Sequence, residues 1–195
     1  MRILAFDPGI SGGYAILDGF IVVARGRMPI DKNLKNKKST INLVEVGRLM
    51  VNHRPDVVVL ERQAPRPGEG VSSAWTSGYN FGLLFATASA IVNNIALVAP
   101  RTWATKLHDL ESPLEDPKAR SLEVAKKLFP LEDFLATERS SKPHEGIIDA
   151  LLIGYWYNQY GQFIVEKELK PKKKKQTPKK KGKKDEKTRK KPLGV

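Results

Sequence analysis

Five short apolar runs mark the strands that this chain is expected to form. They are residues 2–6, 14–18, 20–25, 56–60 and 95–100. Runs of this length, rich in Val, Ile and Leu and bounded by Gly, Pro or an acid, are typical of β-strands with a buried face. The second and third runs are joined at Asp18-Gly19, a dipeptide that favours a two-residue hairpin turn. The chain therefore opens with a meander of three strands.

Longer segments with a helical spacing of apolar residues follow the meander. From Ser39 onward, apolar residues stand at positions 41, 43, 44, 46, 49 and 50, which indicates an amphipathic helix with a Ser/Thr start. Further helices are expected at roughly 76–93, 101–108, 118–128 and 144–160, with a polar loop at 31–38 and a Pro/Gly-rich loop at 62–74. Strands that alternate with helical crossovers predict an α/β fold, in which a mixed five-stranded sheet is flanked by helices on both faces.

The positive charge of the chain is concentrated near its C-terminus. The 195 residues carry a formal net charge of +13, and residues 167–195 hold 15 of the 34 Lys and Arg but only 3 of the 21 Asp and Glu. A segment so rich in like charge cannot build a packed core. We therefore expect one folded domain over residues 1–165 and a disordered Lys-rich tail over 166–195. Such a tail suits nucleic acid, because Lys runs release phosphate counterions; solubilising and nuclear-localisation roles are the alternatives.

Composition also excludes several classes of protein. The chain has no Cys, which rules out disulfides, thiolate zinc sites and a Cys nucleophile. No segment resembles a signal peptide or approaches the roughly 20 apolar residues of a membrane span. We expect a protein of the cytoplasm of a bacterial or phage-infected cell, or of the nucleus if the source is eukaryotic, without membrane contact.

Acidic residues stand at three special places in the predicted fold. Asp7 ends the first strand, and Glu61 ends the first strand after a helical crossover. Glu145 and Asp149 are four residues apart at the start of the last helix, so they share one face of it. If the two strands are neighbours, Asp7 and Glu61 emerge together at the carboxyl ends of parallel strands, where open α/β sheets bind ligands.

Each acid also has an ordinary explanation. The Asp-Pro-Gly sequence is a common turn, Glu61 can pair with Arg62, and acids in a first helical turn suit the helix dipole. Four clustered carboxylates, however, repel one another unless cations lie among them or their pKa values are raised. Carboxylate oxygens select Mg²⁺ or Mn²⁺ over zinc. Two such ions roughly 4 Å apart can activate water and stabilise the leaving oxygen of a phosphodiester.

Four blocks of sequence carry a resemblance to a known family. They are ILAFDPGISGGYAIL, VVVLERQAPRPGEGVSSAWTSGYNFG, VAPRTWATKL and HEGIIDALLIGYW, and they span roughly residues 1–160. Together they resemble the RuvC family of Holliday junction resolvases, most of all its phage-type members. The resemblance implies an RNase H-like fold, a homodimer, two Mg²⁺ ions per active site (with Mn²⁺ as a substitute), no nucleotide cofactor, and paired nicking of four-way DNA junctions.

The resemblance also implies roles for individual acids. Asp7 is similar to the family's first, metal-bridging Asp, Glu61 to its second-strand Glu, and Asp149 to its final Asp. The family usually places an acid or His three residues before that final Asp, where this chain has Gly146.

Two neighbours of Gly146 are candidates for the fourth site residue. Glu145 lies four residues before Asp149 and His144 five before it, as in phage-type variants. Glu145 is the first choice. His144 is the second, and it is also a candidate to act near the attacking water or merely to cap the helix.

Candidate DNA-binding residues follow from the same resemblance. The segment GVSSAW corresponds to the loop that reaches the junction centre in this family, which makes Ser72 and Ser73 candidates for phosphate contacts. Trp75 either stacks on an unpaired base or anchors the following helix in the core. The small-residue helix SGYNFGLLFATASA either forms a dimer surface or packs within the monomer. The basic candidates, for which a solvated helix face is the alternative, are Arg62, Lys106, Lys118 and Arg120.

Other functions fit parts of the pattern. An RNase H-like nuclease of flaps, replication forks or RNA–DNA hybrids would use the same acids, and a DNA binder without activity would not need them. The segment DPGISGGYA also resembles the first phosphate loop of the actin/hexokinase-like ATPases, but no second Asp/Gly-rich loop follows. We therefore expect a metal-dependent endonuclease of four-way junctions, in which a water attacks the scissile phosphate.

Overall fold

The computed structural model describes residues 1–32, 39–65, 67–108 and 115–161. The predicted Lys-rich tail lies outside these residues, as does the end of the predicted domain at residue 165. None of the helices in the described part is long and apolar enough to span a bilayer.

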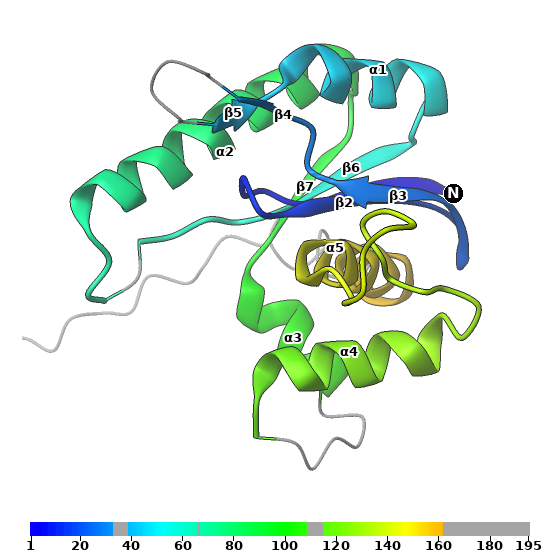
Figure 1. The fold of residues 1–195 in the computed structure, drawn as a ribbon. Coiled ribbons are helices and arrows are strands. Elements are labelled where there is room, and N and C mark those ends of the chain that lie inside the picture. Colours follow the sequence, from blue (N-terminus) through cyan, green and yellow to red (C-terminus); the bar gives the residue numbers. More distant parts are fainter. Residues whose placement is uncertain (33–38, 66, 109–114, 162–195) are drawn as a thin grey trace, which may run out of the picture.

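A mixed five-stranded sheet forms the centre of the structure (Figure 1). Its strands are β1 (Arg2–Asp7), β2 (Gly13–Asp18), β3 (Ile21–Arg27), β6 (Val57–Glu61) and β7 (Ile95–Val98), in the order β3-β2-β1-β6-β7. The β1-β2-β3 meander is antiparallel, whereas β6 and β7 run parallel to β1. The prediction of a mixed sheet opened by a three-strand meander is confirmed.

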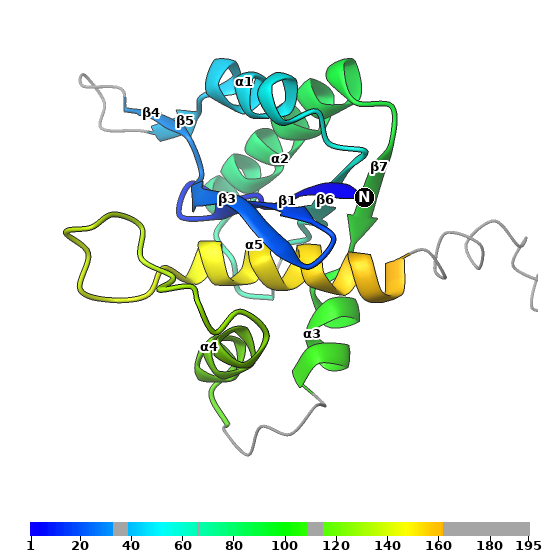
Figure 2. The ribbon, with the colours of Figure 1, turned by 90° about the vertical axis from the view of Figure 1, so that its right-hand side faces the viewer.

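Helices cover both faces of this sheet (Figures 1 and 2). On one face lie α1 (Leu43–His53) and α2 (Val71–Ile91), which pack against each other. On the other face α5 (Glu145–Trp156) runs beneath β1 and β2, and α3 (Pro100–His108) and α4 (Pro117–Leu128) pack against α5 from below. A five-residue π-helical segment, Tyr157–Gly161, follows α5.

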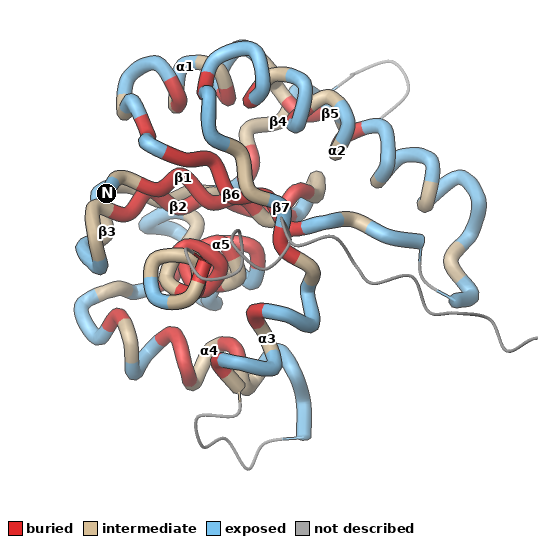
Figure 3. Tube along the Cα trace, turned by 180° about the vertical axis from the view of Figure 1, so that it is seen from behind, coloured by how far each residue is buried: buried red, intermediate tan, exposed pale blue. Residues whose placement is uncertain are grey.

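Alternating side chains of the sheet build two separate cores. Figure 3 shows the buried residues of β1 and β6 in red along the trace. Ile3 and Ala5 of β1 point toward α5, whereas Leu4 and Phe6 point toward α1 and α2. Because both faces of β1 and β6 are covered, their residues are buried almost without interruption, which explains their continuous apolar sequences.

The first predicted helix begins later than expected, and an extra hairpin precedes it. Residues 30–32 and 39–41 form the short antiparallel strands β4 (Ile30–Lys32) and β5 (Ser39–Ile41), so the prediction of a helix from Ser39 was wrong. The helix cap is Asn42, whose Oδ1 accepts a hydrogen bond from the Glu45 amide at 2.9 Å. Asn is among the best N-cap residues, and Ile41 is buried instead as part of the hairpin.

The second predicted helix begins earlier than expected. The loop assigned to 62–74 ends at Gly70, and α2 starts at Val71, so Ser72, Ser73 and Trp75 belong to its first turns. The apolar periodicity of α2 is weak because large apolar residues such as Tyr79 and Phe85 lie on its exposed side, and its start is therefore not evident from the sequence. Trp75 is 74% exposed and therefore does not anchor the helix in the core.

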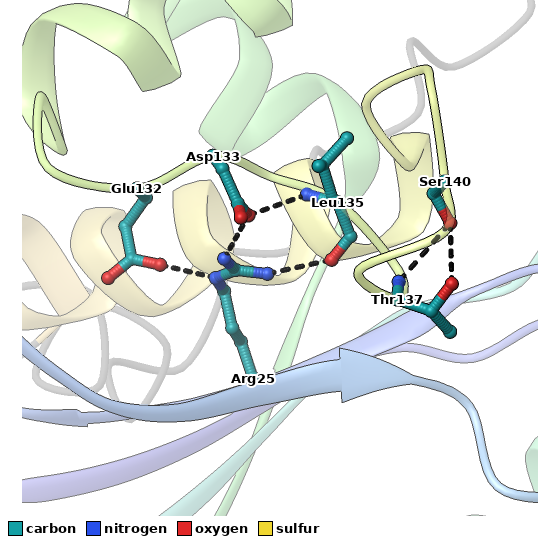
Figure 4. Close-up of polar contacts among 6 residues, drawn as sticks. All are labelled: Arg25, Glu132, Asp133, Leu135, Thr137 and Ser140. Atoms are coloured by element: carbon teal, nitrogen blue, oxygen red, sulfur yellow. Dashed lines mark hydrogen bonds and ion pairs between the residues drawn. The ribbon is translucent and has the colours of Figure 1, made fainter.

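A cluster of polar contacts fixes the segment that leads into α5 (Figure 4). The Arg25 guanidinium on β3 donates to the carboxylates of Glu132 and Asp133 and, at 2.9 Å, to the Leu135 carbonyl. Farther along this segment, the His144 amide donates to the Phe134 carbonyl at 2.8 Å. The start of α5, with its two acids, is thus tied to the edge strand of the sheet.

Candidate active site

The sheet brings two of the predicted site residues to the same edge. In the parallel pairing of β1 with β6, Phe6 is opposite Leu60, so Asp7 and Glu61 are the next residues on neighbouring strands. Neighbouring strands lie about 4.8 Å apart. The condition stated from the sequence, that these two strands are neighbours, is confirmed.

Close backbone packing brings the start of α5 to this edge. Gly146 forms a bridge with Gly12, and a Cβ placed at Gly146 would lie 2.4 Å from the Gly12 carbonyl carbon. A Cβ at Gly13 would meet the Gly146 carbonyl at 2.6 Å. No side chain fits at position 146, which explains why this chain has glycine where the resemblance led us to look for an acid or His.

All four predicted carboxylates line one cavity of about 530 Å³, here called the acid cavity. Asp7, Glu61, Glu145 and Asp149 share its wall with Lys118 and with Glu69, an acid just before α2. Ser73 also lines it and donates a hydrogen bond to Glu69 at 3.0 Å. Sequence reasoning missed Glu69 because it stands in a loop, outside any periodic segment.

Asp149 has the most perturbed environment of these acids. Its pKa is raised to about 7, first because the carboxyl group is buried and then because Glu61 and Glu145 repel its charge. A hydrogen bond from Ser121 and the charge of Lys118 oppose this rise only in part. Ser121 on α4 in turn lies 3.2 Å from Nε2 of His108 on α3. An acid with such a pKa needs either a proton or a nearby cation near neutral pH.

A buried tryptophan holds Glu61. The Trp103 indole N–H donates to Glu61 Oε1 at 2.8 Å, and the two residues are only 4% and 9% exposed. An indole N–H is a donor without acceptor capacity, so the bond holds Oε1 of the Glu61 carboxylate toward Trp103 and orients the group. Trp103 lies in one of the four sequence blocks that resemble the RuvC family. Its contact with Glu61, 42 residues earlier, could not be predicted from the spacing of the two residues.

The two candidates for the fourth site residue lie in different surroundings. Glu145 lines the acid cavity and pairs with the Lys118 ammonium at 2.8 Å. His144 is the N-cap residue of α5 without a capping side-chain bond, and it is not among the residues that line the acid cavity. Burial and the charge of Arg27 lower the pKa of His144. This arrangement favours Glu145.

The DNA-binding candidates divide into those near the acids and those farther away. Lys118 borders the acid cavity, and Arg120 borders a second cavity beside it. Ser72 and Ser73 line a third cavity, of about 660 Å³, between the Pro8–Ser11 turn and α2. Arg62, Trp75 and Lys106 are exposed but line none of these three cavities.

The carboxylates that line the acid cavity are chemically suited to bind hard divalent cations. The four predicted from the sequence lie on two strands and one helix, and one of them has a strongly raised pKa. Within the described residues, no three His, Cys, Asp or Glu side chains already stand together as a metal-ligand set. Lys118 at present provides the positive charge beside Glu145.

Comparison with solved structures identifies the fold. The chain is similar to RuvC of T. thermophilus in complex with Holliday junction substrate, with a TM-score of 0.56, 14% identity, and coverage of 84% of this chain and 96% of that chain. A second Thermus thermophilus RuvC structure matches with a TM-score of 0.51 at the same identity and coverage. No protein-family model and no curated protein sequence matches the chain significantly. The expected α/β fold, with a mixed five-stranded sheet flanked by helices, is confirmed, and it is similar to the fold of these RuvC structures.

The raised pKa of Asp149 predicts a pH-dependent stability. The folded pKa of about 7 exceeds the unfolded value of 3.8, so burial of Asp149 costs stability as pH rises from about 4 to 7, after which the loss levels off. The full loss is on the order of 4 kcal/mol, because one pKa unit corresponds to about 1.4 kcal/mol. In EDTA, Asp149→Asn should therefore unfold at higher urea concentration than the wild type at pH 8, with a smaller difference at pH 4.5. Parallel pH profiles of the two proteins would contradict this prediction.

Proposed function

We propose that this protein is a metal-dependent endonuclease that resolves four-way DNA junctions by paired phosphodiester hydrolysis. The observation that carries the proposal is the acid cavity, in which carboxylates from β1, β6 and α5 meet at the carboxyl edge of a RuvC-type sheet. The neighbour of highest TM-score cited above is a RuvC bound to Holliday junction substrate, which supports the choice of substrate.

The acids have distinct roles in this proposal. Asp7, Glu61, Asp149 and Glu145 would together hold two Mg²⁺ ions, with Asp7 as the ligand shared by both and Glu61 and Asp149 as ligands of one ion each. When bound, the ions would supply a water of lowered pKa and stabilise charge on the leaving oxygen. Lys118, on the wall of the acid cavity, provides positive charge for the scissile phosphate.

The exposed part of α2 supports a homodimer. Trp75, Tyr79 and Phe85 on this helix are exposed, and a Cβ at Gly78 or Gly82 would meet no atom within 4 Å. An exposed apolar helix with small residues allows the same helix of a second copy to approach closely. A dimer of this kind would present two acid cavities to one junction, which paired nicking requires.

Other branched DNA remains the second candidate substrate. Flaps, forks and RNA–DNA hybrids would use the same acid cavity, because metal-assisted hydrolysis does not depend on the shape of the substrate. An ATPase of the actin/hexokinase type needs a second lobe as well as a second phosphate loop, whereas the described residues build one five-stranded sheet with its helices and a short β4-β5 hairpin.

A cleavage assay tests the proposal. Wild-type protein is incubated with a synthetic four-way junction, a flap, a linear duplex or an RNA–DNA hybrid, each in Mg²⁺ or in EDTA. Symmetric paired nicks on the junction, absent in EDTA, are the expected result. Equal cutting of flaps or hybrids would replace the junction by a wider substrate class, and cutting in EDTA would overturn the metal mechanism.

Loss of the Trp103–Glu61 hydrogen bond should weaken metal binding. In Trp103→Phe the Glu61 carboxylate loses its fixed orientation, and outer-shell changes of this kind typically cost about tenfold or more in metal affinity. Mn²⁺ titration monitored by electron paramagnetic resonance measures the change without DNA. Trp156→Phe is the matched control, because the buried Trp156 indole N–H has no hydrogen-bond partner within the described residues. Equal affinities of the two variants would contradict the role given to Trp103.

A further inference from the structure

A second cavity opens beside the acid cavity, between α3, α4 and α5. Its volume is about 500 Å³, and we call it the side cavity. Glu61, Lys118, Glu145 and Asp149 line both cavities, so the two share a wall made of the proposed catalytic residues. Whatever occupies the side cavity therefore lies next to the reacting phosphate.

The side cavity differs from the acid cavity in chemistry. Trp103, Ala104 and Ile148 give it apolar walls, together with the prolines at the starts of α3 and α4. Its polar groups include Ser121 and His108, the pair that lies 3.2 Å apart, in addition to the charged residues at its border. Apolar and aromatic walls combined with placed polar groups are typical of sites for organic ligands, and cavities of roughly 300–1,000 Å³ enclose ligands of that kind.

Positive charge also borders the side cavity. Arg101 at the start of α3 and Lys118 at the start of α4 are exposed residues among its lining, and Arg120 contributes a third basic group. The Arg120 guanidinium is oriented by a hydrogen bond from Nη2 to the Glu115 carbonyl at 2.7 Å. Arg101 escaped the sequence analysis because it stands alone, away from the other basic candidates.

We propose that the side cavity binds a nucleobase that is unstacked from the DNA strand beside the cleaved phosphodiester. The apolar walls accept the flat base, while the basic groups hold the phosphates on either side of it. This inference rests on the proposed nuclease function and names a substrate contact within it. Unstacking a paired base costs a few kcal/mol, and the cost is least where pairing is already broken. A base site beside the acids therefore favours cleavage at a branch point over cleavage of an intact duplex.

The proposal is tested by combining junctions that lack one base with protein variants in which the side cavity is filled. Single abasic sites are placed in turn at the nucleotides around the branch point of a four-way junction, and binding is measured in Ca²⁺ by fluorescence anisotropy. Stacking is worth about 1–3 kcal/mol per base, so one abasic position should weaken binding to the wild type about tenfold. Thr105→Trp, at an exposed residue that lines the side cavity, should weaken binding to the intact junction by a similar factor. The abasic site should then cause no further loss in that variant.

A matched control and a second filling variant complete the design. Thr102→Trp places the same side chain three residues earlier on α3, at an exposed residue that does not line the side cavity, and it should behave as the wild type. Ala104→Phe fills the cavity from its wall and should repeat the result of Thr105→Trp, with folding checked by thermal melting. Fully additive losses, or a wild type that is insensitive to every abasic position, would overturn the base site. Wild-type protein that binds the junctions but cuts none of them in Mg²⁺ would instead overturn the nuclease proposal.

Discussion

Asp7→Asn should abolish cleavage of a four-way junction while junction binding stays intact. Asp7 ends β1 beside Glu61, and in the proposed mechanism it is the acid that both metal ions share. Asn keeps the size of the side chain but removes the charge that holds the cations. We expect a fall of at least about 10³-fold in the single-turnover cleavage rate in Mg²⁺, as typical for loss of a principal charge-stabilising group.

Binding and folding measurements separate this outcome from simple loss of structure. Junction affinity in Ca²⁺ should stay within a few-fold of the wild type, because phosphate contacts come from basic and hydroxyl groups elsewhere. Asp18→Asn is a suitable control, since Asp18 ends the neighbouring strand β2 and pairs with Arg2 at the opposite end of β1. An Asp7→Asn protein that still cuts in Mg²⁺ would exclude Asp7 from the metal site.

Gly146→Ala should strongly destabilise the fold at the site. The added Cβ would lie 2.4 Å from the Gly12 carbonyl carbon, and backbone atoms of a sheet edge cannot move aside as a flexible side chain can. Over-packing of this kind costs about 3 kcal/mol. Because Gly146 lies between Glu145 and Asp149, any relief by movement of α5 also displaces both acids, so cleavage should fall together with stability.

Gly47→Ala provides the matched control for this change. Gly47 lies within α1, and its added Cβ would make an ordinary contact of 3.5 Å with the Ile91 side chain. Ala is the better helix former by about 1 kcal/mol, so urea unfolding should show this variant at or above wild-type stability. If Gly146→Ala unfolds at the same urea concentration as Gly47→Ala, the close packing of α5 on the Gly12-Gly13 backbone is wrong.

The wrongly predicted starts of α1 and α2 show where the local sequence pattern was not sufficient to assign secondary structure. Residues 39–41 were assigned to a helix because their apolar spacing continued that of α1, yet they pair with residues 30–32 in a hairpin. The start of α2 was missed because apolar residues occur on its exposed side as well as its buried side, so the helix has no clear apolar stripe. In both places pairing or exposure, which the sequence does not display, decided the structure.

The sequence alone determined the buried strands of this protein and the positions of its candidate acids. Continuous apolar runs that end in Asp7 and Glu61 specify buried strands with a charge at one edge, because both faces of such strands must be covered by apolar groups. The spacing of Glu145 and Asp149 specifies a shared helix face, since four residues make about one turn. These are local rules, and they sufficed for the fold class and for the candidate acids.

Only the tertiary structure decided how those acids are held. The hydrogen bond from Trp103 to Glu61, the placement of Ser121 beside Asp149, the pKa of about 7 and the backbone contact at Gly146 all join residues far apart in the chain. The side cavity likewise exists only where α3, α4 and α5 meet. Burial and the distances between charged groups depend on the three-dimensional arrangement of the chain, so they cannot be predicted from local sequence.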